Sequence, residues 1–194
     1  MAGKLMPTPS QTVGPFFHLG LARSEWADLT AGNPAGQRIA IEGRVTDGDG
    51  LPVSDAMLEF WQANAAGRYN HPDDRQSDKP LDPNFRGFGR AATDADGRFR
   101  IVTIKPGAVP YDGDSTQAPH IGVIVGARGL LNHLVTRLYF ADEPANAGDP
   151  LLSSIENLAA RGTLIARRQS GGDPPAYRFD IVLQGEGETV FLDL

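Results

Sequence analysis

The sequence predicts a mainly β protein: an antiparallel β-sandwich with long loops and one or two short helices. Three observations support this fold class. Short segments alternate between apolar and polar residues, which is the pattern of half-buried strands. Glycine and proline, present 23 and 15 times, are scattered between these segments, as in a chain with many turns. The length of 194 residues is that of one domain of ordinary size.

The chain is expected to form a single domain spanning residues 1–194. Its first segment, residues 1–35, is rich in Pro, Gly, Ser and Thr and is expected to form an extended N-terminal arm. Long loops are expected at 62–90 and 105–119, and loops of this length within a compact domain are usually functional. The alternating segments predict strands at 38–45, 56–61, 99–104, 121–125, 134–140, 177–183 and 189–192.

One segment has helical spacing instead. Asp149 and Pro150 form an N-cap followed by Pro at the first helical position. Arg161 and Gly162 are a typical helix end, so the pattern predicts one helix between these two signals. Its apolar positions are Leu151, Leu152, Ile155 and Leu158.

Composition excludes several function classes. The formal net charge of −6 argues against a nucleic-acid or anionic-membrane binder, since phosphate binding requires a basic surface. The absence of cysteine excludes disulfides, thiolate metal sites and a cysteine nucleophile. The first residues, MAGKLMPTPSQ, lack the apolar region of a signal peptide, and no apolar run has membrane-spanning length. The cytoplasm is therefore the expected location.

Few residues are candidates for chemistry. Tyr69 lies in the first long loop, and its oxygen is a hard ligand suited to Fe(III), although a partly buried loop tyrosine is the common alternative. His120 and Gly122 share one strand face, where a His-x-His pair would place two imidazoles side by side. A lone strand histidine is more often a hydrogen-bonded core residue than a metal ligand. No partner spacing or catalytic motif accompanies the remaining candidates, which are His18, His71, His133, Asp82 and the RGFGR segment at 86–90.

The ordered motifs are more specific than these single residues, and together they resemble the intradiol aromatic-ring dioxygenases over nearly the whole chain. The resemblance implies a β-sandwich and a non-haem Fe(III) held by two tyrosines and two histidines. It also implies O2-dependent cleavage of a catechol such as protocatechuate to 3-carboxy-cis,cis-muconate. The motifs are TPSQTVGPFFHLGL (8–21), LEFWQANAAGRYNH (58–71), PLDPNFRGFGRAATDADGRF (80–99), TIKPG (103–107), APHI (118–121), TRLYF (136–140) and AYRFDIVLQGEGETVF (176–191).

Carried over to this sequence, the family's ligand positions fall at Tyr69, Val109, His120 and Gly122. Two of the four cannot coordinate iron, since Val109 has no donor atom and Gly122 has no side chain. The resemblance therefore implies a metal site that has lost ligands.

Three more positions depart from the family's catalytic pattern. Tyr111 stands where the pattern has Trp, Gln117 where it has Arg, and Arg137 where it has Gln. We expect Arg137 to fill part of the vacated space with charge.

In one branch of the family the enzyme is built from related alpha and beta chains, and only the beta chain keeps the iron. The resemblance implies that this chain is of the alpha type. It implies a beta-chain partner that binds Fe(III), a higher alpha-beta oligomer, and a substrate pocket completed by the alpha chain. The residues at the pocket-lining positions are Thr12, Gly14, Pro15 and Arg128. An arginine at position 128 can bind a substrate carboxylate through two parallel hydrogen bonds.

Two alternatives remain at this point. In the first alternative to the alpha-type subunit, the chain is a stand-alone intradiol dioxygenase with an altered metal site. In the second, it is a non-catalytic β-sandwich that binds an aromatic ligand. Iron in the isolated chain would favour the first alternative, and aromatic binding without a partner would favour the second.

Overall fold

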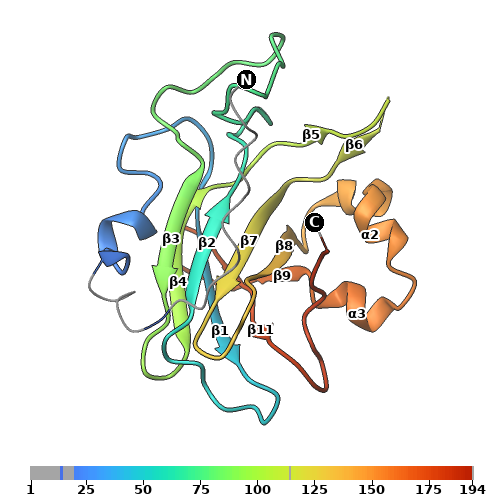
Figure 1. Ribbon diagram of the computed structural model, residues 1–194. Coiled ribbons are helices and arrows are strands. Elements are labelled where there is room, and N and C mark those ends of the chain that lie inside the picture. The colour runs from blue at the N-terminus through green and yellow to red at the C-terminus, as the bar shows by residue number, and fades with distance from the viewer. Residues whose placement is uncertain (1–13, 15–19, 114, 194) are drawn as a thin grey trace, which may run out of the picture.

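The computed structural model describes residue 14 and residues 20–113 and 115–193. Figure 1 shows the strands wrapping around one core, with the short helices on the outside. The elements in chain order are η1 (Ser24–Ala27), β1 (Arg38–Thr46), β2 (Met57–Trp61), β3 (Phe88–Ala92), β4 (Arg98–Ile104), β5 (Val109–Pro110), β6 (Thr116–Gln117), β7 (His120–Gly126), β8 (Leu134–Phe140), η2 (Pro144–Gly148), α2 (Pro150–Ser154), α3 (Leu158–Gly162), β9 (Ile165–Arg168), β10 (Ala176–Arg178) and β11 (Ile181–Val182).

The main sheet has the strand order β11-β1-β10-β9-β8-β7-β2-β3, and β4 pairs with β1 outside this path. The β-sandwich class is confirmed, but the sheet is mixed. Strand β1 runs parallel to β10 and β11, and β8 runs parallel to β9. The parallel pair β8–β9 is possible because η2, α2 and α3 form a crossover between the two strands. Strands β5 and β6 form a separate hairpin that projects from the sheet within the expected loop 105–119 (Figure 1).

The core lies between two walls of this wrapped sheet. Period-two alternation sends one set of side chains inward from every strand. The wall of β1, β4, β10 and β11 contributes Ile39, Ile41, Val45, Phe99, Ile101, Tyr177 and Ile181, and the wall of β2, β7 and β8 contributes Leu58, Phe60, Ile121, Val123, Val125, Leu138 and Phe140.

Two strand predictions need correction. The predicted strand 177–183 is split, because the Asp180 carboxylate accepts the backbone N–H of Arg44 and interrupts the ladder with β1. The predicted strand 189–192 does not form. The backbone of this segment bonds to separate elements instead, with Thr189 N–H donating to Val182 and Leu192 N–H donating to Val135. Strands β3 and β9 were not predicted, since β3 carries little apolar alternation and β9 is short.

The predicted single helix is two short helices. Ile155 has extended backbone angles, and the Asn157 side chain then caps α3 by accepting from the backbone N–H of Ala159 and Ala160. The predicted N-cap is confirmed, since the Asp149 side chain accepts from Leu152 N–H. None of the helices in the described part of the chain has the length and apolar character needed to span a lipid bilayer.

Asp149 also connects the helical crossover to the sheet. Its carboxylate is fully buried and accepts hydrogen bonds from the Ala118 backbone N–H at 2.8 Å and the Tyr139 hydroxyl at 3.1 Å, besides Leu152 N–H at 2.9 Å. Three donors therefore compensate the loss of water around this carboxylate. The same contacts fix the start of β7, where His120 lies.

Asp149→Ala is expected to lower the free energy of unfolding by about 2–4 kcal/mol, because three buried donors lose their acceptor. The control is Asn157→Ala, which removes the cap of an exposed helix and is expected to cost only about 1 kcal/mol. Urea denaturation of both variants measures the difference. Equal losses would show that Asp149 is only a helix cap.

Candidate functional site

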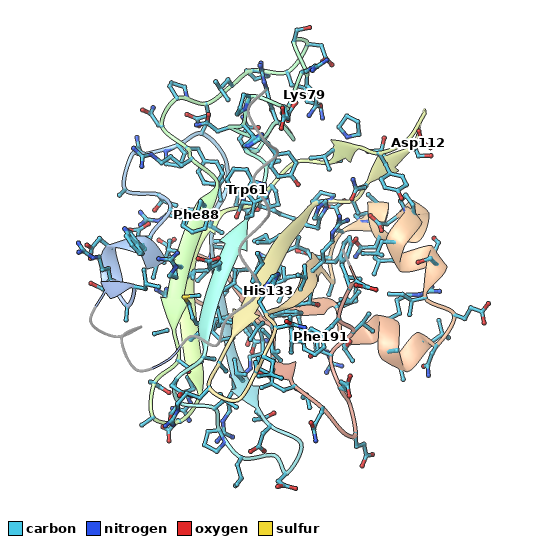
Figure 2. All side chains as sticks on the ribbon, viewed as in Figure 1. Trp61, Lys79, Phe88, Asp112, His133 and Phe191 are labelled. Carbon is cyan, nitrogen blue, oxygen red and sulfur yellow. The ribbon has the colours of Figure 1, made fainter. Side chains whose placement is uncertain are left out.

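The site is built around a row of residues that crosses four strands. Phe88 on β3 pairs with Trp61 on β2, Trp61 pairs with Gly122 on β7, and Gly122 pairs with Arg137 on β8. Directly paired residues point to the same face of a sheet. On this face the row therefore presents two aromatic side chains, then a glycine without a side chain, and then the guanidinium of Arg137. Figure 2 shows Phe88 and Trp61 at the same end of their strands.

A cavity of about 230 Å³ opens above this row. Gly122 leaves the space free, since a β-carbon there would contact only the Trp61 carbonyl oxygen, at 3.4 Å. The remaining lining comes from the neighbouring positions of the same strands and from one loop residue, Tyr69. The full lining is Glu59, Phe60, Trp61, Tyr69, Phe88, His120, Gly122, Val123, Ile124, Val135, Thr136 and Arg137.

Tyr69 and His120 meet at the edge of the cavity. The Tyr69 hydroxyl lies 3.5 Å from His120 Nε2, and the Tyr69 ring stacks on Trp61 with ring centroids 5.8 Å apart. His120 Nδ1 lies 2.8 Å from the Ala118 carbonyl oxygen. Because a carbonyl can only accept, Nδ1 carries the proton and Nε2 is the acceptor that faces the tyrosine hydroxyl.

Both members of this pair are held in their neutral forms. Burial is the main cause that lowers the pKa of His120 to about 4, and the nearby Arg137 guanidinium lowers it further. Burial likewise raises the pKa of Tyr69, with Asp74 adding to the rise and Arg137 opposing it. At neutral pH the pair is therefore a phenol and an imidazole, and the Arg137 guanidinium lies close enough to both to affect their pKa values.

Arg137 is oriented by Gln117, whose side-chain oxygen accepts a hydrogen bond from the guanidinium. These are two of the positions where the sequence departs from the family's catalytic pattern. That pattern has Arg at position 117 and Gln at position 137, so the two residue types are exchanged between the β6–β7 segment and β8. The expectation that Arg137 places charge in the vacated space agrees with its position in the cavity wall.

Val109 completes the set of four ligand positions. It is buried on β5 and lines a second hollow of about 390 Å³ together with Tyr69 and Gln117. The four positions carried over from the family are thus brought together around Tyr69. Tyr111, where the catalytic pattern has Trp, directly follows β5 in the β5–β6 connection, is 59% exposed and lines neither hollow.

These residues do not fit a four-ligand Fe(III) site. Tyr69 and His120 face each other, but the other two positions, Val109 and Gly122, have no side-chain donor atom, so two of the four ligands are missing. A guanidinium in the same wall opposes a second cation. Across residues 20–113 and 115–193, moreover, no three side chains of the His, Asp or Glu type gather closely enough to hold a metal ion.

The pocket-lining residues of the N-terminal arm are only partly described. Thr12 and Pro15 lie outside the described residues, as does His18, and Gly14 has a left-handed φ of 68°. Arg128 follows β7 and so lies at the opposite end of this strand from His120. Its side chain is 72% exposed and forms an ion pair with Asp55. Arg128 therefore does not belong to the cavity of Tyr69 and His120.

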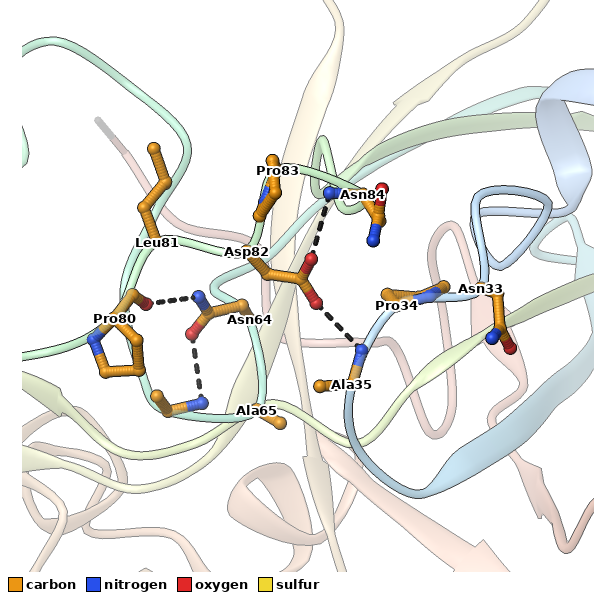
Figure 3. Close-up of a pocket in the computed structure, with 11 residues that line it drawn as sticks. Asn33, Pro34, Ala35, Asn64, Ala65, Pro80, Leu81, Asp82, Pro83 and Asn84 are labelled. Carbon is orange, nitrogen blue, oxygen red and sulfur yellow. Dashed lines mark hydrogen bonds between the residues drawn. The ribbon is translucent and has the colours of Figure 1, made fainter.

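Asp82 proves to be a loop anchor. Its carboxylate accepts from Ala35 N–H at 2.8 Å and from Asn84 N–H at 2.9 Å, which connects two surface loops (Figure 3). The two loops border an open hollow of about 660 Å³. Asn64 lines the same hollow, and its side chain donates to the Pro80 carbonyl oxygen and accepts from the Ala66 backbone N–H. The Asp82 and Asn64 side chains thus bond to the loop backbone, as expected for turn chemistry.

Sequence reasoning missed the role of Asp149 and of Trp61 in this site. Asp149 was recognised only as a helix cap, and its contacts to Ala118 and Tyr139 depend on how the crossover packs on the sheet. Trp61 was recognised only as a strand residue. Its position beside Gly122 follows from strand register, which no local signal in the sequence specifies.

The chain matches the family described as Dioxygenase over residues 13–185. It is 45% identical to the alpha chain of protocatechuate 3,4-dioxygenase from Pseudomonas putida, and the alignment covers 98% of both chains. It is also 45% identical to the beta chain of that enzyme from Burkholderia cepacia, where the alignment covers 81% of this chain and 69% of the beta chain.

Solved structures show the same fold. The dioxygenase domain of a dioxygenase and carbohydrate-binding fusion protein from Streptomyces sp. SirexAA-E has a TM-score of 0.62 at 30% identity, covering 93% of this chain and 99% of that domain. Catechol 1,2-dioxygenase from Pseudomonas arvilla C-1 has a TM-score of 0.63 at 23% identity, covering 81% of this chain and 55% of that enzyme.

The low pKa of His120 gives the fold a pH dependence. Because the pKa is about 4 in the folded chain against an ordinary value of 6.5, the unfolded chain binds the proton more readily. Stability is therefore highest above pH 6.5 and falls as the pH drops toward 4, by up to about 1.4 kcal/mol per pH unit.

His120→Phe is expected to remove this part of the acid sensitivity, as measured by urea denaturation at pH values from 4 to 7. The same substitution at the exposed His71 serves as the control. An unchanged pH slope in His120→Phe would contradict the assignment of a neutral, buried imidazole.

Proposed function

Because this chain belongs to the intradiol dioxygenase family, we propose that it is the non-catalytic subunit of a two-chain protocatechuate 3,4-dioxygenase. It is a homologue of alpha chains of that enzyme along nearly its whole length. The proposed reaction is the O2-dependent cleavage of protocatechuate between its two hydroxyl-bearing carbons, giving 3-carboxy-cis,cis-muconate. The proposed location is the cytoplasm, in agreement with the absence of cysteine from the sequence.

One observation carries the non-catalytic assignment: Tyr69 and His120 lie beside Val109 and Gly122, which have no side-chain donor atom, and beside the Arg137 guanidinium. In the proposed enzyme the beta chain would hold the Fe(III), which would supply the activation of a catechol substrate toward O2. This chain contributes structure and positive charge to that pocket.

The proposed contribution comes from Thr12, Gly14, Pro15 and Arg128. Gly14 and Pro15 suit a slim and stiff wall against a flat aromatic ring, because glycine tolerates the left-handed φ of 68° and proline fixes its own backbone angle. Arg128 suits the substrate carboxylate. Its guanidinium is exposed, and it lies at a sheet end far from this chain's own cavity, where a partner chain has room to approach.

The proposed partner is a beta chain, in an assembly of several alpha-beta pairs. A related pair is plausible on physical grounds, since this chain is as similar to a beta chain over the shared fold as to an alpha chain.

The two alternatives predict different properties. A stand-alone enzyme needs donors for iron in this chain. Among the described residues that line the two hollows, the His and Tyr side chains are Tyr69, His120 and His71, and the His71 imidazole is half-exposed beside Asp73. A binding module needs no partner at all.

Iron content and colour distinguish these proposals. The chain purified alone is expected to be colourless and free of iron, whereas co-expression with the beta chain is expected to give a complex with a visible tyrosinate-to-iron absorption and dioxygenase activity. Near-stoichiometric iron in the isolated chain would refute the non-catalytic assignment. Arg137→Gln tests the cause, since iron gained by this variant would show that the guanidinium helps to exclude metal.

Arg128→Ala in the assembled enzyme is expected to raise KM for protocatechuate about tenfold and to change KM for catechol little, because catechol has no carboxylate. Asp55→Ala is the matched control: it removes the ion-pair partner and keeps the guanidinium. Steady-state kinetics with both substrates measure the effect. Equal changes for the two substrates would exclude a carboxylate-directed role.

A further inference from the structure

The cavity above Gly122 has no part in the proposed reaction, yet its walls are chemically specific. One wall is aromatic: Trp61 is 36% exposed and Phe88 is 43% exposed, although both lie in a sheet whose other face is fully buried. Large apolar side chains side by side at a hollow are a feature of ligand sites. The opposite wall is the Arg137 guanidinium, and the floor between the walls is a residue without a side chain.

The charge of Arg137 is not neutralised by a carboxylate in the described part of the chain. Its guanidinium donates to the neutral side-chain oxygen of Gln117 and also hydrogen-bonds the Tyr139 side chain, whose hydroxyl donates to the Asp149 carboxylate at 3.1 Å. The acidic residue in the lining, Glu59, is engaged by Arg90, whose Nε donates to it at 2.9 Å. Glu59 and Arg90 thus compensate each other, and the cavity retains one net positive charge beside an apolar surface.

We infer that this cavity binds a small aromatic carboxylate without any metal, with the ring between Trp61 and Arg137 above Gly122 and the carboxylate on the Arg137 guanidinium. The ligand class is a single-ring aromatic acid, and benzoate is its simplest member. The site is built by this chain alone, so it does not depend on the identity of the partner.

The dimensions agree with one ring. Adjacent strands lie about 4.8 Å apart, so the backbones of Trp61 and Arg137 are about 10 Å apart with Gly122 between them. A volume of about 230 Å³ lies below the range of roughly 300–1,000 Å³ that is typical for drug-sized ligands. A planar ring stacks on an indole, and a carboxylate accepts two parallel hydrogen bonds from a guanidinium.

The test counts benzoate sites by isothermal titration calorimetry on the full chain, in whichever form it purifies, alone or with its partner. The readout is the number of benzoate molecules bound per copy of this chain in the wild type and in Arg137→Gln. A site on a partner chain contributes equally to both proteins and cancels. We expect one saturable site that Arg137→Gln weakens about tenfold or more, and we expect benzamide, which has the same shape and no charge, to bind weakly.

Two further variants separate binding from folding. Gly122→Val fills the space and keeps the charge, so it is expected to abolish the site while thermal unfolding stays cooperative. Arg100→Gln makes the same charge change on the exposed side of β4, where the arginine contacts Glu42, and it is expected to leave benzoate binding unchanged. A wild-type chain without this site, or equal binding by wild type and Arg137→Gln, would overturn the inference.

Discussion

The structure depends on the position of β7 between β2 and β8. Because its side chains alternate, one strand serves two purposes: Ile121, Val123 and Val125 enter the core, while His120 and Gly122 face outward to the site. A slip of one residue in the register would exchange the two faces and expose the core. The apolar face thus fixes where each site residue lies, and the large energy of core burial holds the outer face in place without any metal bond.

On this face the buried polar groups of the site are compensated by contacts within the chain. Burial keeps Tyr69 and His120 uncharged, and their mutual hydrogen bond satisfies polar atoms that would otherwise be costly to bury. Asp149, the N-cap of α2, accepts from the Ala118 backbone N–H, and the Ala118 carbonyl oxygen in turn accepts from His120 Nδ1 and orients the imidazole. The pocket is therefore stable without a metal ion: Tyr69 and His120 are neutral, and the Arg137 guanidinium in the wall carries a positive charge.

Much of the fold was predictable because period two is a local signal. The strands β1, β4, β7 and β8 and the cap at Asp149 were found within a residue or so. The loss of two ligand positions was also readable, since Val109 and Gly122 are visible as residue types in the family pattern. The contacts that give the site its character were not predictable. The row through Phe88, Trp61 and Arg137 and the Gln117–Arg137 hydrogen bond follow from register between distant segments, which single-sequence patterns do not specify.

The exchange of Arg and Gln between positions 117 and 137 has a consequence for how this chain can change over evolution. Restoring ligands at Val109 and Gly122 alone would bring a trivalent cation next to a guanidinium in a poorly hydrated pocket, where like charges repel strongly. Each intermediate sequence would carry either an incomplete ligand set or this repulsion, so a gradual return to iron binding passes through unfavourable variants. The exchange of Arg and Gln between these two positions therefore favours the retention of a metal-free site in this chain.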